Sequence, residues 1–217
     1  IRPAYAMAHN NLGLTLGEQD KLEEAVVHYR QALALQPDYA EAYNNLGSAL
    51  KAQSKLEEAI VQYRQALALR PAYAMAHNNL GTALCEQGKL EEAVAHYRQA
   101  LALQPAFVEA YSNLGNALRE QGKLEEAIGQ YRQALALRPG FAEAINNLGM
   151  LLQEVGKLEE AVACCRQALA LKPDFAGAHQ NLSHLLARLS DFRQVVVESD
   201  TALNLKPDSA AIWESRL

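Results

Sequence analysis

The sequence predicts an all-α fold, a solenoid of about six helix-turn-helix units stacked in chain order. Two regularities indicate it. An asparagine followed by leucine returns every 34 residues, at Asn11, Asn45, Asn79, Asn113, Asn147 and Asn181. All seven prolines keep the same spacing, at Pro3, Pro37, Pro71, Pro105, Pro139, Pro173 and Pro207. Self-similarity at a fixed period of this size indicates an array in which each unit packs against its neighbours.

Each interval between prolines holds two amphipathic segments, because proline cannot occupy a helix interior and marks a junction. In the second unit we expect a first helix over about 39–53 and a second over about 55–69, since apolar residues recur there at helical spacing. Asp20 and Ser54, each followed three residues later by glutamate, are expected to form capping boxes.

The period divides the chain as a single array over residues 1–217. We expect the end of a preceding unit at 1–5, the start of a further helix at 210–217, and a longer parent array around them. The six units between are about 6–39, 40–73, 74–107, 108–141, 142–175 and 176–209.

The composition excludes several functional classes. A net charge of −5 argues against a nucleic-acid binder, which carries a basic face. The sequence has no run of about 18 apolar residues, so no segment is expected to enter a membrane. The three cysteines form no Cys-x-x-Cys motif, and adjacent Cys164 and Cys165 would make a strained disulfide, so a reducing, cytoplasmic setting is expected.

The regularly placed residues of each unit resemble the tetratricopeptide repeat family. In the third unit they are Leu80, Gly81, Leu84, Ala93, Tyr97, Ala100 and Pro105. The resemblance covers nearly the whole chain and implies a right-handed superhelix whose first helices line a concave groove. The sixth unit departs from the pattern, with Ser183 for glycine and Ser199 for tyrosine, a drift typical of a capping repeat or a junction to another domain.

Catalytic and metal-binding patterns do not accompany the repeats. The histidines lack His-Glu-x-x-His or similar spacing, so His9, His77 and His179 are expected at helix interfaces. Glutamate pairs at the starts of second helices suit the helix dipole rather than acid–base catalysis. We therefore expect no enzyme activity, cofactor or metal in this fragment, which leaves open a catalytic domain elsewhere in the parent protein.

Asparagines occupy the side of each first helix opposite its apolar stripe. Asparagine costs roughly 0.5 kcal/mol relative to alanine within a helix, so the ten at the paired positions would cost about 5 kcal/mol. We expect them to contact a ligand in the groove, together with Asn116. They are Asn11, Asn45, Asn79, Asn113, Asn147 and Asn181 in one row, with Asn10, Asn44, Asn78 and Asn146 beside it.

Two accounts explain these asparagines. In the structural account, each amide hydrogen-bonds a neighbouring helix. In the functional account, a ladder of amides holds the backbone of an extended peptide, because a primary amide offers both donor and acceptor. The second resembles the asparagine ladder of O-linked N-acetylglucosamine transferases. Acidic residues outnumber basic ones along the same side, which predicts a preference for neutral or mildly basic segments.

The leading functional hypothesis is a protein–protein interaction module that binds an extended peptide in its concave groove. Two alternatives stay open: the substrate-selecting arm of a larger O-linked glycosyltransferase-like protein, and a scaffold that assembles a complex through its convex face or ends. The expected partner is a protein or peptide of unknown identity, not nucleic acid or a membrane. Self-association through exposed apolar ends is also expected.

Overall fold

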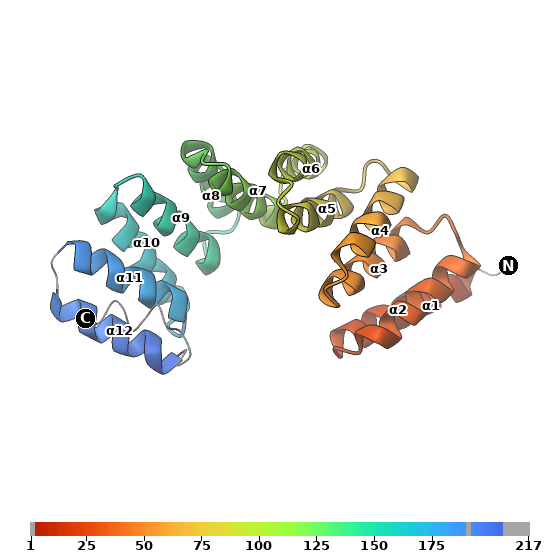
Figure 1. Ribbon diagram of the computed structural model, residues 1–217, viewed down its shortest axis with the longest axis horizontal. Helices are drawn as coiled ribbons and strands as arrows, with labels where there is room; N and C mark the ends of the chain where they lie inside the picture. Colours follow the sequence, from red (N-terminus) through yellow and green to blue (C-terminus); the bar gives the residue numbers. More distant parts are fainter. Residues whose placement is uncertain (1–2, 190–191, 206–217) are drawn as a thin grey trace. The chain divides into compact units, whose positions relative to one another are not determined.

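A computed structural model describes residues 3–189 and 192–205, and within these ranges it contains twelve α-helices and no strand (Figure 1). The first helices of the repeats are α1 (Pro3–Glu18), α3 (Ala40–Ala52), α5 (Ala74–Glu86), α7 (Val108–Glu120), α9 (Ala142–Glu154) and α11 (Ala176–Arg188). The second helices are α2 (Leu22–Leu35), α4 (Leu56–Leu69), α6 (Leu90–Leu103), α8 (Leu124–Leu137), α10 (Leu158–Leu171) and α12 (Phe192–Leu205). The predicted all-α fold of about six repeats is confirmed; the further helix expected at 210–217 lies outside the described residues.

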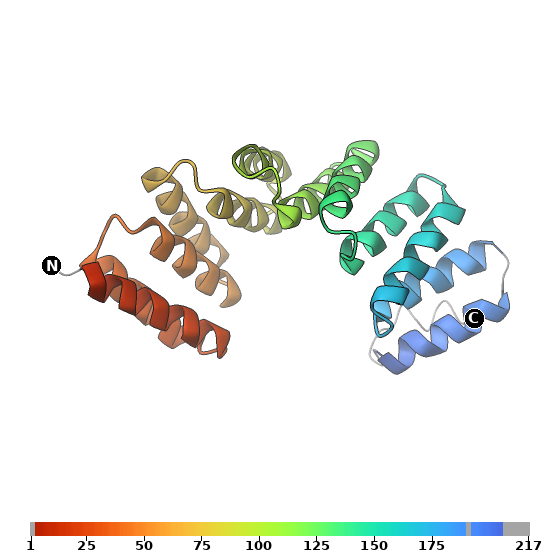
Figure 2. The ribbon, with the colours of Figure 1, turned by 180° about the vertical axis from the view of Figure 1, so that it is seen from behind.

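The chain divides into two compact units, Ile1–Ala117 and Leu118–Leu217. In the first unit α1 pairs with α2, α3 with α4 and α5 with α6. The first helices there also contact one another, α1 with α3 and α3 with α5. In the second unit α9 pairs with α10, α11 pairs with α12, and α9 contacts α11 (Figure 2). First helices therefore lie side by side within each unit.

The core of a repeat forms where a tyrosine of the second helix lies against a glycine of the first. Tyr97 is only 2% exposed, and a Cβ added to Gly81 would come within 2.8 Å of its ring atom Cε1. Glycine is required there, because any larger side chain would displace the ring. In the fifth repeat Cys165 replaces the tyrosine, and a Cβ on Gly149 would meet its nearest neighbour, Cys164 Cβ, at 3.2 Å. The contact is therefore looser where the tyrosine is missing.

The turn inside the second repeat differs from the predicted capping box. Lys55, not Ser54, stands at the N-cap of α4 without a side-chain capping bond, and α2 begins in the same way after Asp20. Ser54 has a left-handed φ of 61°, the conformation that glycine adopts in three other repeats. Its N–H donates to the Lys51 carbonyl, and the N–H of Lys55 donates to the Leu50 carbonyl, both at 2.9 Å. The capping-box prediction is therefore wrong, because these residues close the preceding helix in a Schellman motif.

The arginine column on the second helices carries weak surface ion pairs. Arg30 lies 3.9 Å from Glu58, and Arg64 lies 3.6 Å from Glu92, with all four side chains more than half exposed. Exposed pairs of this kind contribute 0 to about 1 kcal/mol each. Across the part of the chain that the structure describes, no helix has the length and apolar composition to cross a membrane.

Candidate functional site

A ladder of amide hydrogen bonds joins neighbouring first helices. In each bond, Nδ2 of the second asparagine of one repeat donates to Oδ1 of the first asparagine of the preceding repeat, at 3.0 Å. The bonded pairs are Asn45–Asn10, Asn79–Asn44 and Asn113–Asn78 in the first unit and Asn181–Asn146 in the second. A hydrogen bond of this type contributes about 1 kcal/mol net, which offsets the poor helix propensity of asparagine.

The two asparagines of a pair lie in different surroundings. The first of each pair is buried, with exposures of 4% for Asn10, 4% for Asn44, 7% for Asn78 and 5% for Asn146. The second is exposed at Asn11 and half-buried at Asn45, Asn79, Asn113, Asn147 and Asn181. The structure thus differs from the expectation that both asparagines face a groove. Successive helix residues point about 100° apart, so only the second asparagine of each pair reaches the surface. We call the surface of the first helices on which these second asparagines lie the first-helix face.

The half-buried amides keep hydrogen-bonding capacity after the ladder has formed. A primary amide has two N–H donors and an oxygen with two lone pairs. Asn79 uses one N–H on Asn44, and its Oδ1 accepts a long bond of 3.5 Å from Nδ2 of Asn78. One N–H and one lone pair of Asn79 are therefore left for water or a ligand. Its neighbour Asn45 is bonded in the same way.

Buried tyrosines of the second helices donate hydrogen bonds to hydroxyl side chains of the first helices. The Tyr63 hydroxyl donates to Ser48 Oγ and the Tyr97 hydroxyl to Thr82 Oγ1, both at 3.2 Å. Burial raises the pKa of both phenols, so they remain protonated donors at neutral pH. These bonds connect α4 to α3 and α6 to α5, the first helices of their own repeats. Asn116, which the sequence placed with the ligand-contacting residues, stands at the position of Ser48 and Thr82 and is half-buried.

Asn147 differs from the other ladder residues in its hydrogen bonding. It bonds the hydroxyl of Tyr131, a fully buried side chain of the second unit. Burial raises the pKa of Tyr131 to about 12, and the bond to Asn147 opposes this rise by favouring the ionised form. In the preceding repeat Ser112 holds the place of the buried asparagine. The amide-to-amide pattern is therefore not uniform along the sequence.

Ion pairs also cross the first-helix face. Lys51 Nζ lies 2.9 Å from Glu86 Oε1, and in the second unit an Arg119 guanidinium nitrogen lies 2.6 Å from Glu154 Oε1. In each pair the two residues stand 35 positions apart. The sequence predicted an excess of acidic residues on this side of the first helices, but not that acidic and basic residues of neighbouring repeats would pair. The fixed separation, shared with the asparagine ladder, is the signal that could have identified the pairs.

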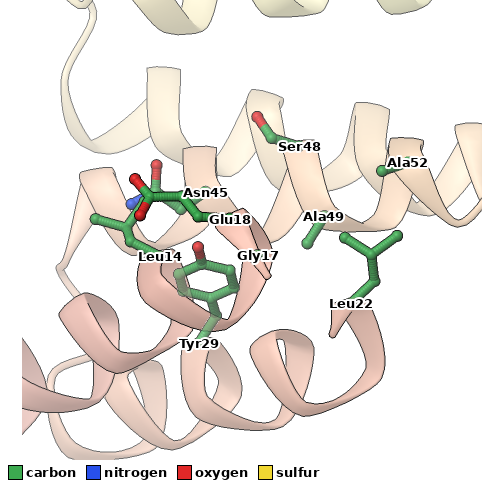
Figure 3. A pocket seen from close by; sticks show the side chains of 9 residues that line it. All are labelled: Leu14, Gly17, Glu18, Leu22, Tyr29, Asn45, Ser48, Ala49 and Ala52. Carbon is green, nitrogen blue, oxygen red and sulfur yellow. The ribbon is translucent and has the colours of Figure 1, made fainter. Parts of the chain in front are cut away.

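A cavity of about 310 Å³ opens on this face between the first two repeats (Figure 3). Sequence reasoning did not predict it. Its lining comes from α1, α2 and α3: Leu14, Gly17, Glu18, Leu22, Tyr29, Asn45, Ser48, Ala49 and Ala52. The cavity and the ladder therefore share one residue, Asn45.

Histidine pairs join the two helices of the first and third repeats, as the sequence predicted for His9 and His77. Nδ1 of His77 lies 3.0 Å from Nδ1 of His96, and His9 lies at the same distance from His28. His77 Nε2 lies 2.9 Å from the Pro71 carbonyl oxygen, so its N–H donates there. His77 Nδ1 must then accept the Nδ1–H of His96.

The histidine pair predicts a pH-dependent stability. Burial lowers the pKa of His96, His77 and Arg64 lower it further, and Glu92 partly opposes them. An unfolded histidine takes up its proton near pH 6.5, whereas folded His96 does so only at lower pH. Below about pH 6.5 the unfolded state therefore binds more protons. The free energy of unfolding, measured in urea, should fall as the pH is lowered from about 7.5 to about 5.5.

A matched control for this prediction exists within the chain. The second repeat has Tyr43 and Gln62 where the third has His77 and His96. The double variant His77→Tyr/His96→Gln copies that pair and should weaken the pH dependence over the same interval. An unchanged pH dependence in the variant would show that His96 is not its source.

Metal binding has no support in the described part of the chain, residues 3–189 and 192–205. No group of three or more histidine, cysteine, aspartate or glutamate side chains is placed there to hold a metal ion. All three cysteines are free thiols. Burial raises the pKa of Cys164 and of Cys165, the latter to about 12, so both thiols are protonated and poorly nucleophilic at neutral pH.

Comparisons with known proteins agree with this architecture. A family model described as TPR repeat matches residues 16–54, 47–85, 81–118 and 115–156, and one described as Tetratricopeptide repeat matches residues 142–175. Among curated proteins, none matches the sequence.

Solved structures with the same fold come from proteins of different roles. The type IV pilus biogenesis factor PilW gives a TM-score of 0.89 at 20% identity, over 96% of this chain and 97% of its own. The APC/C hetero-tetramer Cut9-Hcn1 gives 0.87 at 17% identity over 99% of this chain, which spans 43% of that chain. YrrB, described as a TPR protein with an unusual peptide-binding site, gives 0.68 at 23% identity, over 87% of this chain and 97% of its own. At these identities the likeness shows the fold alone.

Proposed function

The chain belongs to the tetratricopeptide repeat family, whose repeats are typical of protein–protein interaction and scaffold modules, and we propose that its first-helix face binds an extended segment of a partner protein. The observation that carries the proposal is the half-buried amides of the second asparagines, Asn45, Asn79 and Asn113 in the first unit and Asn147 and Asn181 in the second. Where ladder bonds hold them, each keeps one N–H and one lone pair for a ligand. Those two groups match the C=O and N–H of a peptide unit.

Preorganisation supports binding through the backbone. The bonds from Asn45 to Asn10 and from Asn79 to Asn44 fix the amides before any ligand arrives. Amides held in place lose little rotamer entropy when a peptide binds, so more of each contact appears as affinity. A surface that binds mainly the peptide backbone makes few contacts with side chains, so it can bind partners of varied sequence. The peptide-binding site named for YrrB shows that another protein with this fold binds peptides.

The proposal is tested with a peptide selected from a random library against the intact chain. N-methylation of one backbone nitrogen at a time removes N–H donors while keeping every side chain. We expect methylation at the contacted positions to weaken binding by about fivefold, since each lost hydrogen bond to a ladder amide costs about 1 kcal/mol. Alanine scanning of the same peptide should cost less at most positions. If only the alanine scan weakened binding, the backbone proposal would be wrong.

A second candidate is the substrate-selecting arm of a larger O-linked glycosyltransferase-like protein. Asparagine at all six ladder positions, from Asn11 to Asn181, is the observation that favours it. Such an arm would use the same face to hold its substrate protein. A parent sequence that carries a glycosyltransferase domain would support this role, and a parent without one would exclude it. In a scaffold that used only the outer helices, ladder substitutions would leave partner binding unchanged.

A further inference from the structure

The cavity between the first two repeats forms where two side chains are missing. In the second and third repeats, Lys51 and Glu86 fill the corresponding place with an ion pair at 2.9 Å. In the first and second repeats the same positions hold Gly17 and Ala52, so no ion pair can form. A Cβ added to Gly17 would meet nothing within 4 Å. The opening therefore follows from sequence, since these two positions carry almost no side-chain volume.

Much of the cavity lining is apolar. Leu14 stands where the later repeats have Ser48 and Thr82, so a side chain that elsewhere accepts a tyrosine hydroxyl is here a hydrocarbon. Leu22 and the ring of Tyr29 add apolar lining from α2. In Figure 3 the Tyr29 side chain extends from α2 toward the labelled side chains of α1 and α3. Apolar walls with a few polar groups are typical of ligand sites, and about 310 Å³ lies at the small end of their size range.

The polar groups of the cavity give it a negative character. Glu18 belongs to the lining, and it forms no ion pair within the described residues 3–189 and 192–205. Burial of Tyr29 raises the pKa of its phenol to about 12, and the charge of Glu18 is the second cause of this rise. The Glu18 carboxylate therefore acts on the Tyr29 side of the cavity. Asn45 and Ser48 contribute neutral hydrogen-bonding groups from α3. In Figure 3 the Tyr29 hydroxyl points toward the side where Glu18 and Asn45 lie. A cation is therefore favoured at that side.

We propose that this cavity binds an aliphatic or aromatic side chain of the partner segment, with a lysine or arginine next to that side chain placed against Glu18. The inference rests on the proposed function, because it gives that function a site of side-chain selection at one end of the ladder. Asn45 belongs to both sites, so a segment held by the ladder reaches the cavity without leaving the first-helix face. The ion pair Lys51–Glu86 fills the corresponding place between the second and third repeats, and Arg119–Glu154 fills it between the fourth and fifth.

Small probes test the cavity without a known partner. 3-Methylbutylammonium combines a leucine-like body with a cation, 3-methylbutanol has the same body without charge, and 3-methylbutanoate is an anion. We expect the ammonium to shift the backbone amide NMR signals of Gly17, Glu18, Ala49 and Ala52 saturably, with a Kd about threefold lower than that of the alcohol. The butanoate should cause no saturable shift. Equal binding of all three probes, or shifts spread over the surface, would overturn the proposal.

A matched variant closes the cavity with residues the chain already uses. Gly17→Lys with Ala52→Glu copies the Lys51–Glu86 pair, and it should abolish the probe-induced shifts without lowering stability. Glu18→Gln should remove the preference for the ammonium over the alcohol and leave the cavity open. Saturable binding that persisted in the closed variant would mean that the probes bind elsewhere.

The same variants separate this inference from the proposed function. If the ladder binds peptide and the cavity selects one side chain, the closed variant should still bind library peptides. Peptides selected on it should lack the apolar residue beside lysine or arginine that the parent protein enriches. Peptide binding with no such enrichment on the parent protein would refute the cavity proposal alone. Saturable probe binding without any peptide binding would refute the proposed function, while the preference of the cavity for an apolar group beside a cation would stand.

Discussion

Replacing Gly81 with valine should lower the free energy of unfolding by about 2 kcal/mol or more. A Cβ at Gly81 would lie 2.8 Å from Cε1 and 2.9 Å from Cδ1 of Tyr97. The Tyr97 ring is 2% exposed, and its hydroxyl is bonded to Thr82, so it cannot move aside without breaking that bond and opening a void. The loss is measured by urea or guanidinium unfolding followed by circular dichroism.

Two further glycines serve as controls for this packing prediction. Gly129, inside α8, has nothing within 4 Å of an added Cβ, so Gly129→Ala should raise stability by about 1 kcal/mol through helix propensity. Gly149→Ala should cost less than Gly81→Ala, because the nearest side-chain atom is Cys164 Cβ at 3.2 Å rather than a tyrosine ring. Equal effects at all three positions would contradict the tyrosine-on-glycine account of the core.

Removing the half-buried ladder amides should weaken peptide binding by about 100-fold. The triple variant Asn45→Ala/Asn79→Ala/Asn113→Ala deletes three amides, each expected to contribute about 1 kcal/mol to binding. The effect is measured as the Kd of a selected peptide by fluorescence anisotropy. An unchanged Kd in a folded variant would contradict the proposed function.

Stability complicates the interpretation of that variant. Its substitutions also remove the bonds to Asn10, Asn44 and Asn78, which join neighbouring first helices. Each lost bond costs about 1 kcal/mol of folding free energy, and the higher helix propensity of alanine offsets roughly half of that. A weaker Kd alone could therefore reflect altered packing between repeats. The chain itself provides the control, because each bond can also be removed from its buried end.

The repeats and their helices could be predicted from the sequence because both depend on periodicity. In the second repeat the expected helices and the observed ones, Ala40–Ala52 and Leu56–Leu69, agree within about one residue. The turn was predicted wrongly because Ser54 suits two places, the N-cap of one helix and the left-handed end of another. Only the backbone φ of 61° distinguishes them.

The roles of Asn78 and Asn79 could not be separated from the sequence. Both are polar and adjacent, and both lie on the side of the helix away from its apolar stripe. The difference arises between repeats, since α7 supplies the amide of Asn113 that bonds and helps to bury Asn78. The cavity was missed for a similar reason. Gly17 and Ala52 look ordinary within their own helices, and only comparison with Lys51 and Glu86 shows what is missing.

The most direct test compares two triple variants that break the same three ladder bonds from opposite ends. Asn45→Ala/Asn79→Ala/Asn113→Ala removes the surface amides, and Asn10→Ala/Asn44→Ala/Asn78→Ala removes their buried acceptors. We predict a loss of stability in both, with about 100-fold weaker binding of the selected peptide in the first and about tenfold in the second, which keeps the surface amides but no longer fixes them before the peptide binds. Equal loss of binding in both variants would show that the ladder only holds the repeats together.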